Sequence, residues 1–220
     1  MSIKAVIFDL DGTLLDTIDD ITNSMNEALQ SMNLSTFTIE DYKIFVGLGV
    51  DHLVHEVLNA QNADEVIFED LKRKYLTNYL MKQNDETKPY SGILTMLEAL
   101  KEKNINVCVL SNKPDIDTQL VIKYYFKDYP FFSVMGKRPG FEVKPNPSSV
   151  NEMIALLQVN TSEVLYVGDT STDMETAVNA LLTPVGVLWG FRQKEELLLS
   201  GAEYIIRHPS ELLEVIEKRS

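Results

Sequence analysis

The sequence predicts an α/β fold, a doubly wound parallel sheet interrupted by a helical insertion. Short apolar runs rich in β-forming residues are typical of parallel strands buried on both faces, and six such runs lie at 5–8, 107–110, 131–134, 164–167, 185–189 and 204–206. Helical patterns lie between them. Alternation of strand and helix favours right-handed crossovers and a sheet covered by helices on both faces.

The first crossover is much too long for a single connection. There are 102 positions between Asp9, after the first run, and Ser111, after the second. A crossover needs only about a dozen residues, and the helical pattern at 91–103 already supplies one. The surplus at 17–86 is itself helical, so we expect an inserted helical domain at 17–86 and a core formed by 1–16 and 87–220.

Apolar residues at helical spacing support the helices of both parts. In the insertion these residues are Leu29, Met32, Val54, Val57, Leu58, Leu71, Tyr75, Leu76 and Leu80. In the core they form three stripes, namely Leu94, Leu97 and Leu100, then Met153, Leu156 and Leu157, and finally Leu212, Leu213 and Ile216.

Composition and charge exclude several classes of partner. The 220 residues include 20 basic and 33 acidic side chains, a formal charge of −13, and the insertion holds 5 of the basic and 13 of the acidic residues. An acidic chain is unsuited to nucleic acid or to an anionic membrane surface. Cys108 is the single cysteine, and the chain starts without a long apolar leader. We therefore expect a cytoplasmic protein with neither kind of partner.

Carboxylates gather at the predicted carboxyl ends of the strands, where open α/β sheets bind ligands. Asp9 and Asp11 follow the first run, and their side chains point the same way because strand side chains alternate. Asp169 and Asp173 follow the fourth run. Like charges in one place repel, so a cation must hold them together. Hard oxygen donors favour Mg²⁺, which typically also binds a substrate phosphate.

Two further residues complete this pattern. The Ser111 hydroxyl and the Lys144 ammonium are suited to receive phosphate oxygens. The residues alone thus predict Mg²⁺-assisted phosphoryl transfer with a carboxylate nucleophile.

Four motifs resemble those of the haloacid dehalogenase superfamily, in the same order along the whole chain. They are Asp9-x-Asp11-Gly12-Thr13, Ser111-Asn112, Lys144-Pro145 and Gly168-Asp169-x-x-x-Asp173. The resemblance implies a Rossmann-like core, and the insertion resembles the type-one cap of that superfamily. Further segments are similar to the phosphoglycolate phosphatase branch, namely Asp16-Thr17-x-x-Asp20, 45–53, Asn112-Lys113-Pro114 and Trp189-Gly190-Phe191.

The resemblance implies a role for each motif residue. Asp9 would be the nucleophile, and Asp11 would protonate the leaving group and later activate water. Mg²⁺ would be held by the Asp9 side chain, the Asp11 carbonyl and Asp169. Asp173 would support the metal's waters or orient Lys144.

The remaining motif residues are expected to bind phosphate. The resemblance assigns the Ser111 hydroxyl, the Asn112 amide and Lys144 to the phosphoryl oxygens, and Thr13 to the loop and the phosphate. In the insertion, Gly47 and Gly49 resemble the cap loop that reaches the active site. The partner implied is a small phosphorylated metabolite such as phosphoglycolate.

Alternatives within and outside the superfamily stay open. A β-phosphoglucomutase-like mutase would use the same nucleophile, but that branch places a histidine where this chain has Ile21. Pyrophosphatase and nucleotidase activities use the same core. A silent phosphate-binding protein is disfavoured by the intact Asp9 and Asp11 pair. One departure from the branch is Ala180-Leu181-Leu182, where an Ala-Gly pair usually ends the helix, and it should cost helix-end stability.

Overall fold

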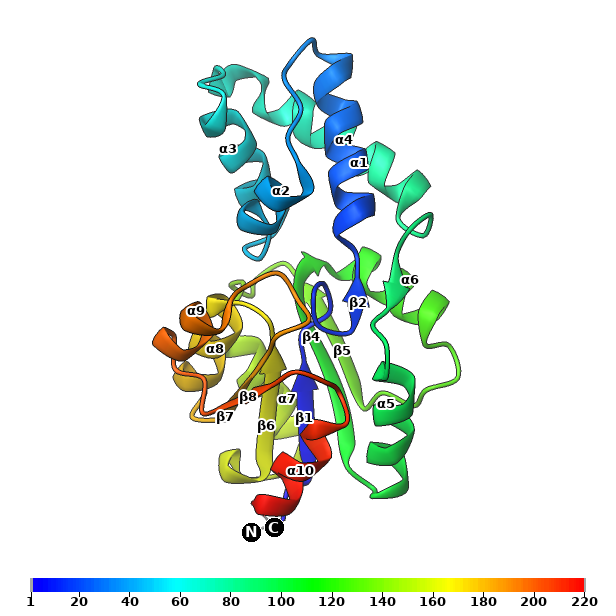
Figure 1. Ribbon diagram of the computed structural model, residues 1–220, viewed down its shortest axis with the longest axis vertical. Coiled ribbons are helices and arrows are strands. Elements are labelled where there is room, and N and C mark those ends of the chain that lie inside the picture. Colours follow the sequence, from blue (N-terminus) through cyan, green and yellow to red (C-terminus); the bar gives the residue numbers. More distant parts are fainter. Residues whose placement is uncertain (1, 220) are drawn as a thin grey trace. The chain divides into compact units, whose positions relative to one another are not determined.

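The computed structural model describes residues 2–219, and the chain divides into two compact units. The first unit comprises the chain up to Leu15 and from Pro89 onward, and the second is Asp16–Lys88. The boundary falls within two short strands that pair with each other, β2 (Leu15–Asp16) and β3 (Lys88–Pro89). Figure 1 colours the chain continuously from blue at its start to red at its end, so the second unit lies within the blue-to-cyan part of the colour range.

The first unit is built on a six-stranded sheet in the order β5-β4-β1-β6-β7-β8, with every adjacent pair parallel. The strands are β1 (Ala5–Phe8), β4 (Asn106–Pro114), β5 (Ser133–Lys137), β6 (Val164–Gly168), β7 (Thr183–Val187) and β8 (Tyr204–Ile206). The predicted doubly wound parallel sheet is confirmed.

Helices cover both faces of this sheet (Figure 1). They are α5 (Ile93–Glu102), α6 (Asp115–Tyr125), α7 (Ser148–Leu157), the 3₁₀ turn η2 (Thr161–Glu163), α8 (Ser171–Asn179), α9 (Lys194–Leu199) and α10 (Glu211–Lys218). Side chains alternate across β1, so Val6 and Phe8 join the core beneath α5, α6 and α10. Ala5 and Ile7 join a second core beneath α7 and α8. Two buried faces explain why β1 is apolar at every position.

Two predicted strands lie at shifted positions. The run at 131–134 was expected to pair, but β5 begins at Ser133, because Phe131 instead packs edge-on against Phe126 and Tyr129. The run at 185–189 begins earlier, at Thr183, and the chain has left the strand by Trp189. No residue of 131–134 is fully buried, and Phe132 is 45% exposed, so apolar character alone does not define which residues pair.

Two of the predicted helix stripes contain an exposed residue. Leu94 and Leu156 are each 55% exposed. In α5 the buried positions are Ile93, Met96, Leu97 and Leu100. These positions follow the i, i+3, i+4, i+7 rule of a single helix face, on which Leu94 does not lie.

The second unit is helical throughout. Its elements are α1 (Ile18–Ser31), α2 (Ile39–Phe45), α3 (Val50–Ala60), the 3₁₀ turn η1 (Glu65–Ile67) and α4 (Phe68–Lys82). The α1 helix packs mainly on α4, around a core that includes Met25, Leu29 and Leu71. Leu80, expected in this core, is half exposed. Asp20 accepts hydrogen bonds from the backbone N–H groups of Glu86 and Thr87, which ties the returning chain to α1.

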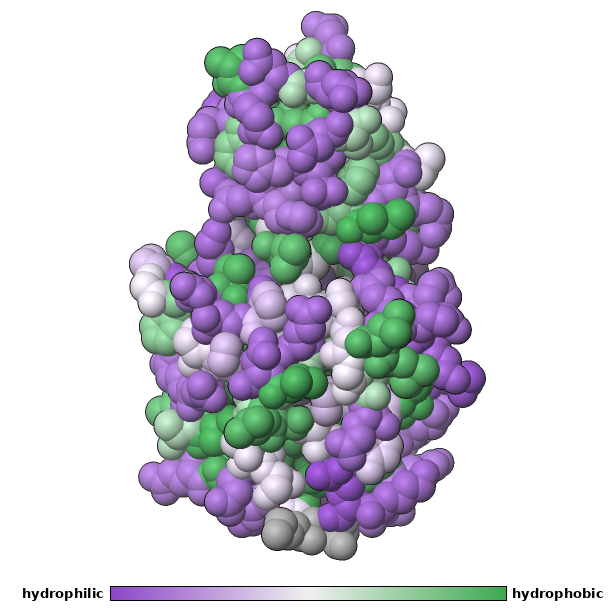
Figure 2. All heavy atoms as spheres, turned by 90° about the vertical axis from the view of Figure 1, so that its left-hand side faces the viewer, coloured by the Kyte–Doolittle hydropathy of each residue, from purple (hydrophilic) through white to green (hydrophobic). Residues whose placement is uncertain are grey.

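Hydrophilic side chains occupy most of the face drawn in Figure 2, with hydrophobic residues scattered between them on each unit. Among residues 2–219, no helix is both long enough and apolar enough to cross a membrane.

Candidate active site

The three central strands of the sheet deliver the motif residues to one edge. Asp9 follows β1, Ser111 and Asn112 belong to β4, and Asp169 follows β6. The β4, β1 and β6 strands are neighbours and run parallel, so their carboxyl ends meet. This is the position at which open α/β sheets form ligand sites.

The loop after β1 is tightly folded around its first residues. The carbonyl of Leu10 accepts hydrogen bonds from the N–H groups of Leu14 and Leu15, both at 3.0 Å. Gly12 adopts φ +86°, and a β-carbon there would lie 2.4 Å from an oxygen of Asp169. Only glycine fits this approach, so the loop presses directly on the carboxylate that follows β6.

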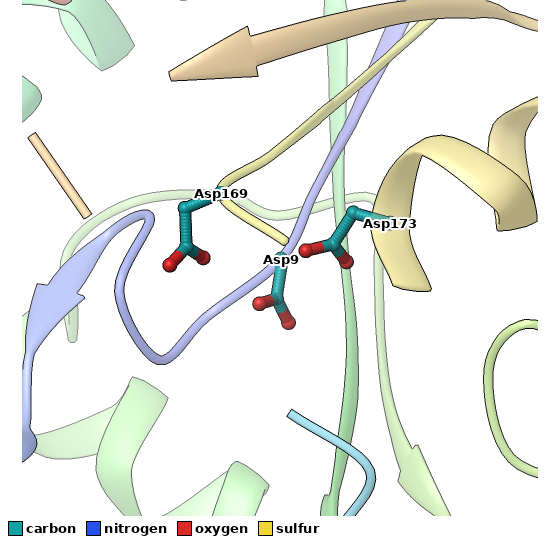
Figure 3. Close-up of side chains that lie close together, drawn as sticks. All are labelled: Asp9, Asp169 and Asp173. Carbon is teal, nitrogen blue, oxygen red and sulfur yellow. The ribbon is translucent and has the colours of Figure 1, made fainter. Parts of the chain in front are cut away.

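Three aspartates converge at this edge (Figure 3). Oxygen atoms of Asp9, Asp169 and Asp173 all lie within 4.8 Å of one another, and all three residues are buried. Asp169 accepts hydrogen bonds from the Thr13 hydroxyl at 2.9 Å and from the Phe191 N–H at 2.8 Å. The cluster is therefore held rigidly by its own surroundings.

Lys144 is the cation in contact with this cluster. Its Nζ donates to Asp9 Oδ1 at 2.6 Å and to Asp173 Oδ1 at 2.7 Å, and its side chain is 3% exposed. Asn112 positions it: its Oδ1 accepts from the Lys144 N–H at 2.8 Å and its Nδ2 donates to the Lys144 carbonyl at 3.2 Å. The Asn112 side-chain amide thus contacts the Lys144 backbone on both sides of the peptide unit.

Asp173 has two sets of partners. Its Oδ1 meets Lys144, while its Oδ2 accepts from the N–H of Thr170 at 3.1 Å and from the Thr170 hydroxyl at 2.8 Å. The second set is a capping box at the start of α8. The geometry places Asp173 against Lys144, the second of the two roles that the resemblance implied for it.

Burial and mutual repulsion disturb the acids of the cluster. Burial, and then the charge of Asp173, raise the pKa of Asp9 well above its ordinary value. The same two causes raise the pKa of Asp169 to about 7. Burial would lower the pKa of Lys144, but Asp173 and Asp9 reverse this and hold it well above its ordinary value. The lysine is therefore a permanent cation at neutral pH.

The donors fit a divalent cation. Within residues 2–219, the side chains grouped closely enough to hold a metal are these three carboxylates, the oxygen donors that Mg²⁺ prefers, and one lysine does not balance three buried acids. Asp9 and Asp169 are the side chains that would hold Mg²⁺, since Asp173 is committed to Lys144 and to its helix.

A second lysine contacts Asp11. Lys113 Nζ lies 2.9 Å from Asp11 Oδ1, with side-chain exposures of 8% and 20%. Asp117, at the start of α6, lies near both residues, and burial raises its pKa while Lys113 opposes the rise. Asp9 and Asp11 are thus two residues apart in sequence yet paired with different cations.

The remaining predicted residues are located as follows. Ser111 is buried beside the cluster's edge of the sheet, and its Oγ accepts from the Lys113 N–H at 3.2 Å. Gly47 and Gly49 lie between α2 and α3 in the second unit, with φ of +124° and +89°. Both take up backbone conformations that favour glycine.

The comparison with protein families matches the chain to a haloacid dehalogenase-like hydrolase over residues 6–187. The chain belongs to this family. It is a phosphoric monoester hydrolase, as predicted, with the fold and the superfamily that the four motifs indicated.

Curated relatives of this haloacid dehalogenase-like hydrolase match along most of its length. A phosphoglycolate phosphatase of Vibrio parahaemolyticus is 29% identical over 97% of this chain and 96% of its own. One of Rhodobacter capsulatus is 32% identical, covering 86% of both chains. Among solved structures, a predicted phosphoglycolate phosphatase from Haemophilus somnus is 25% identical, with a TM-score of 0.91 over 98% of both chains.

Sequence reasoning missed two residues of this hydrolase's site. Lys113 was noted only as part of the Asn112-Lys113-Pro114 motif, without a role. Tyr166 was treated as part of an apolar strand, but its hydroxyl lies 3.5 Å from Asp173 Oδ1. A polar hydroxyl within a strand buried on both faces is the signal that could have identified it.

Proposed function

We propose that this protein is a Mg²⁺-dependent phosphatase that hydrolyses a small phosphomonoester of the phosphoglycolate type through an aspartyl-phosphate on Asp9. One observation carries the proposal: Asp9 and Asp11, two residues apart, are held by different lysines. Two carboxyl groups kept in different surroundings can take different roles, one as nucleophile and the other as acid and base. The substrate class is supported by the curated relatives, which are phosphoglycolate phosphatases.

The proposed reaction has two displacements. The Asp9 carboxylate attacks phosphorus while the bond from phosphorus to the leaving oxygen breaks, and Asp11 gives that oxygen a proton. Asp11, now a carboxylate, takes a proton from water, which attacks the aspartyl-phosphate and releases inorganic phosphate. Splitting one difficult displacement into two easier steps is the advantage of covalent catalysis.

The other residues stabilise and orient the phosphoryl group. Lys144 offsets charge on Asp9 and on the phosphoryl oxygens, while the Ser111 hydroxyl donates to the phosphate. Thr13 and Phe191 fix Asp169 through the hydrogen bonds described above. Bound Mg²⁺ supplies positive charge that draws substrate and nucleophile together.

Further assignments follow from the same proposal. We assign the catalytic core to 1–16 and 87–220 and a cap to 17–86, in which the loop carrying Gly47 and Gly49 helps to select the leaving group. A cytoplasmic location is supported by the single thiol, Cys108, which is buried and has no partner for an internal disulfide.

The test is phosphate release from a panel of phosphomonoesters with Mg²⁺, including phosphoglycolate, nucleotides, pyrophosphate and β-glucose 1-phosphate. We expect turnover of small phosphomonoesters, and isomerised sugar phosphate would instead support a mutase. Asp9→Asn should abolish turnover and keep the fold, whereas Glu175→Gln, an exposed charge change on α8, should keep activity. Phosphate release by the Asp9 variant at the parent rate would contradict the assigned nucleophile.

A further inference from the structure

The segment that follows β7 contacts both the loop after β1 and the carboxylate after β6. The Trp189 indole N–H donates to the Thr13 carbonyl at 2.9 Å, and the Phe191 N–H donates to Asp169 Oδ2 at 2.8 Å. The Thr13 hydroxyl in turn donates to Asp169 Oδ1 at 2.9 Å. These three hydrogen bonds, together with the chain between Trp189 and Phe191, form a closed ring of contacts.

The ring is closed in the interior of the first unit. Thr13 and Asp169 are fully buried, and Trp189 packs against the apolar core beneath α5, α6 and α10. Between the two donors of the segment, Gly190 lies so close that a β-carbon there would overlap the Asp169 side chain and the Gly12 carbonyl oxygen. Water does not compete for hydrogen bonds in such surroundings, so the ring fixes the positions of its members.

The apolar core does not require the indole N–H of Trp189. A phenylalanine would keep much of the contact with that core, but it would offer the Thr13 carbonyl no donor. Both oxygens of the Asp169 carboxylate accept a hydrogen bond, and a carboxylate has about four lone-pair sites, so sites remain for a metal. The two donors therefore set the orientation in which those sites are presented.

We propose that Trp189 is a positioning residue that fixes the Thr13 peptide, so that the Thr13 hydroxyl holds the Asp169 carboxylate in the orientation that binds Mg²⁺. This inference rests on the proposed function, in which Asp169 is a ligand of the metal. Without the indole donor, the Thr13 peptide gains freedom, and its hydroxyl no longer holds Oδ1 in one place. Loss of a hydrogen-bond partner that orients a metal ligand lowers metal affinity by about 10- to 100-fold.

Trp189→Phe tests this with Tyr129→Phe as the matched control. Tyr129 packs against the same core, and its hydroxyl donates to the Leu97 carbonyl at 3.1 Å, so each variant loses one side-chain donor to a backbone carbonyl. Calorimetry should show a Kd for Mg²⁺ about tenfold higher in the Trp189 variant, the lower end of that range because the contact is indirect. The Tyr129 variant should keep the parent Kd.

Thr13→Val tests the route by which Trp189 acts. The substitution removes the hydroxyl that contacts Asp169 and keeps the shape of the side chain. If Trp189 acts through this hydroxyl, the two losses do not add, and the double variant binds Mg²⁺ within twofold of Thr13→Val alone. Losses that multiply in the double variant would overturn the inference.

Amide hydrogen exchange in EDTA supplies a readout that depends on neither metal nor turnover. The amides of residues 12–15 all donate within the loop after β1, and they should exchange about five- to tenfold faster in Trp189→Phe but not in Tyr129→Phe. Unchanged exchange there, or a Kd for Mg²⁺ within twofold of the parent, would overturn the inference. A parent that released no phosphate would contradict the proposed function, and loop exchange would still decide whether Trp189 holds Thr13.

Discussion

Removing one charge from the acid cluster is expected to stabilise the metal-free protein by an amount that grows with pH. Burial, and then Asp173, raise the pKa of Asp169 from 3.8 to about 7. Folded protein therefore keeps the Asp169 proton over a pH range in which the unfolded chain has lost it. Stability contributed by this group is lost as pH rises from about 4 to 7, because unfolding then releases a proton.

The magnitude follows from the size of the shift. Each pKa unit of the shift corresponds to ~1.4 kcal/mol. Relative to pH below 4, the raised pKa of Asp169 therefore lowers the free energy of unfolding by about 4 kcal/mol above pH 7 and by about 1.5 kcal/mol at pH 5. Asp169→Asn removes the charge and keeps both hydrogen bonds, because its oxygen can accept from Phe191 and its amide can donate to Thr13. The stability gain of the variant over the parent should therefore be about 3 kcal/mol larger at pH 8 than at pH 5.

Urea unfolding in the presence of EDTA measures this difference. Trp189 is the single tryptophan, and its indole N–H donates to the Thr13 carbonyl at 2.9 Å, so its fluorescence reports the unit that holds the site. Glu175→Gln removes a charge from the exposed face of α8 and should show no such pH dependence. Equal gains for Asp169→Asn at pH 5 and pH 8 would refute the reasoning.

Magnesium should reverse the order of stability. A ligand that binds only the folded state stabilises it by mass action, and carboxylate ligands must be deprotonated to bind the metal. Added MgCl₂ should therefore stabilise the parent more at pH 8 than at pH 5. It should stabilise Asp169→Asn little at either pH. Equal Mg²⁺ stabilisation of both proteins would remove Asp169 from the set of ligands.

Three further substitutions test local features of the first unit. Leu181→Gly should raise stability by about 0.5–1 kcal/mol in thermal or urea unfolding, whereas Leu181→Ala should not, because only glycine relieves the φ of +59°. Lys113→Gln should lower kcat/KM roughly tenfold, because it removes the charge that contacts Asp11. Lys123→Gln, an exposed position of α6, should leave kcat/KM unchanged. Gly12→Ala should cost about 2 kcal/mol or more and weaken Mg²⁺ binding measured by calorimetry, because its β-carbon would meet Asp169.

The sequence predicted the architecture because the parallel sheet leaves a strong pattern. Strands buried on both faces must be apolar at every position, and β1 and β6 were placed to within one residue. The sequence did not separate residues that pair from residues that only pack. Phe131 was placed in a strand on its apolarity, yet it is held by neighbouring rings, a contact that no local pattern encodes.

The helix end after α8 shows a departure that was correctly recognised in the sequence. Ala180-Leu181-Leu182 replaces the usual glycine, and the structure still forms the hydrogen bonds of a Schellman motif. Leu182 N–H donates to the Ala177 carbonyl at 2.8 Å and Leu181 N–H to the Val178 carbonyl at 3.0 Å. Leu181 takes the left-handed conformation with its side chain 78% exposed, so the motif stabilises a leucine where glycine is favoured.

The candidate site shows why the motif residues were easier to find in the sequence than the contacts that position them. Asp9, Asp169 and Lys144 were identified because charged groups at strand ends are conspicuous in sequence. Asn112 was also identified as a motif residue, but its contact with the Lys144 backbone is recognisable only once the fold brings two residues far apart in the chain together. The chain concentrates like charges that would repel one another, and it fixes the Lys144 ammonium among them through hydrogen bonds to Asp9 and Asp173. An ammonium held in this way cannot follow a moving phosphoryl group, so Lys144 must be aligned before substrate arrives, and its surroundings rather than its own flexibility determine that alignment.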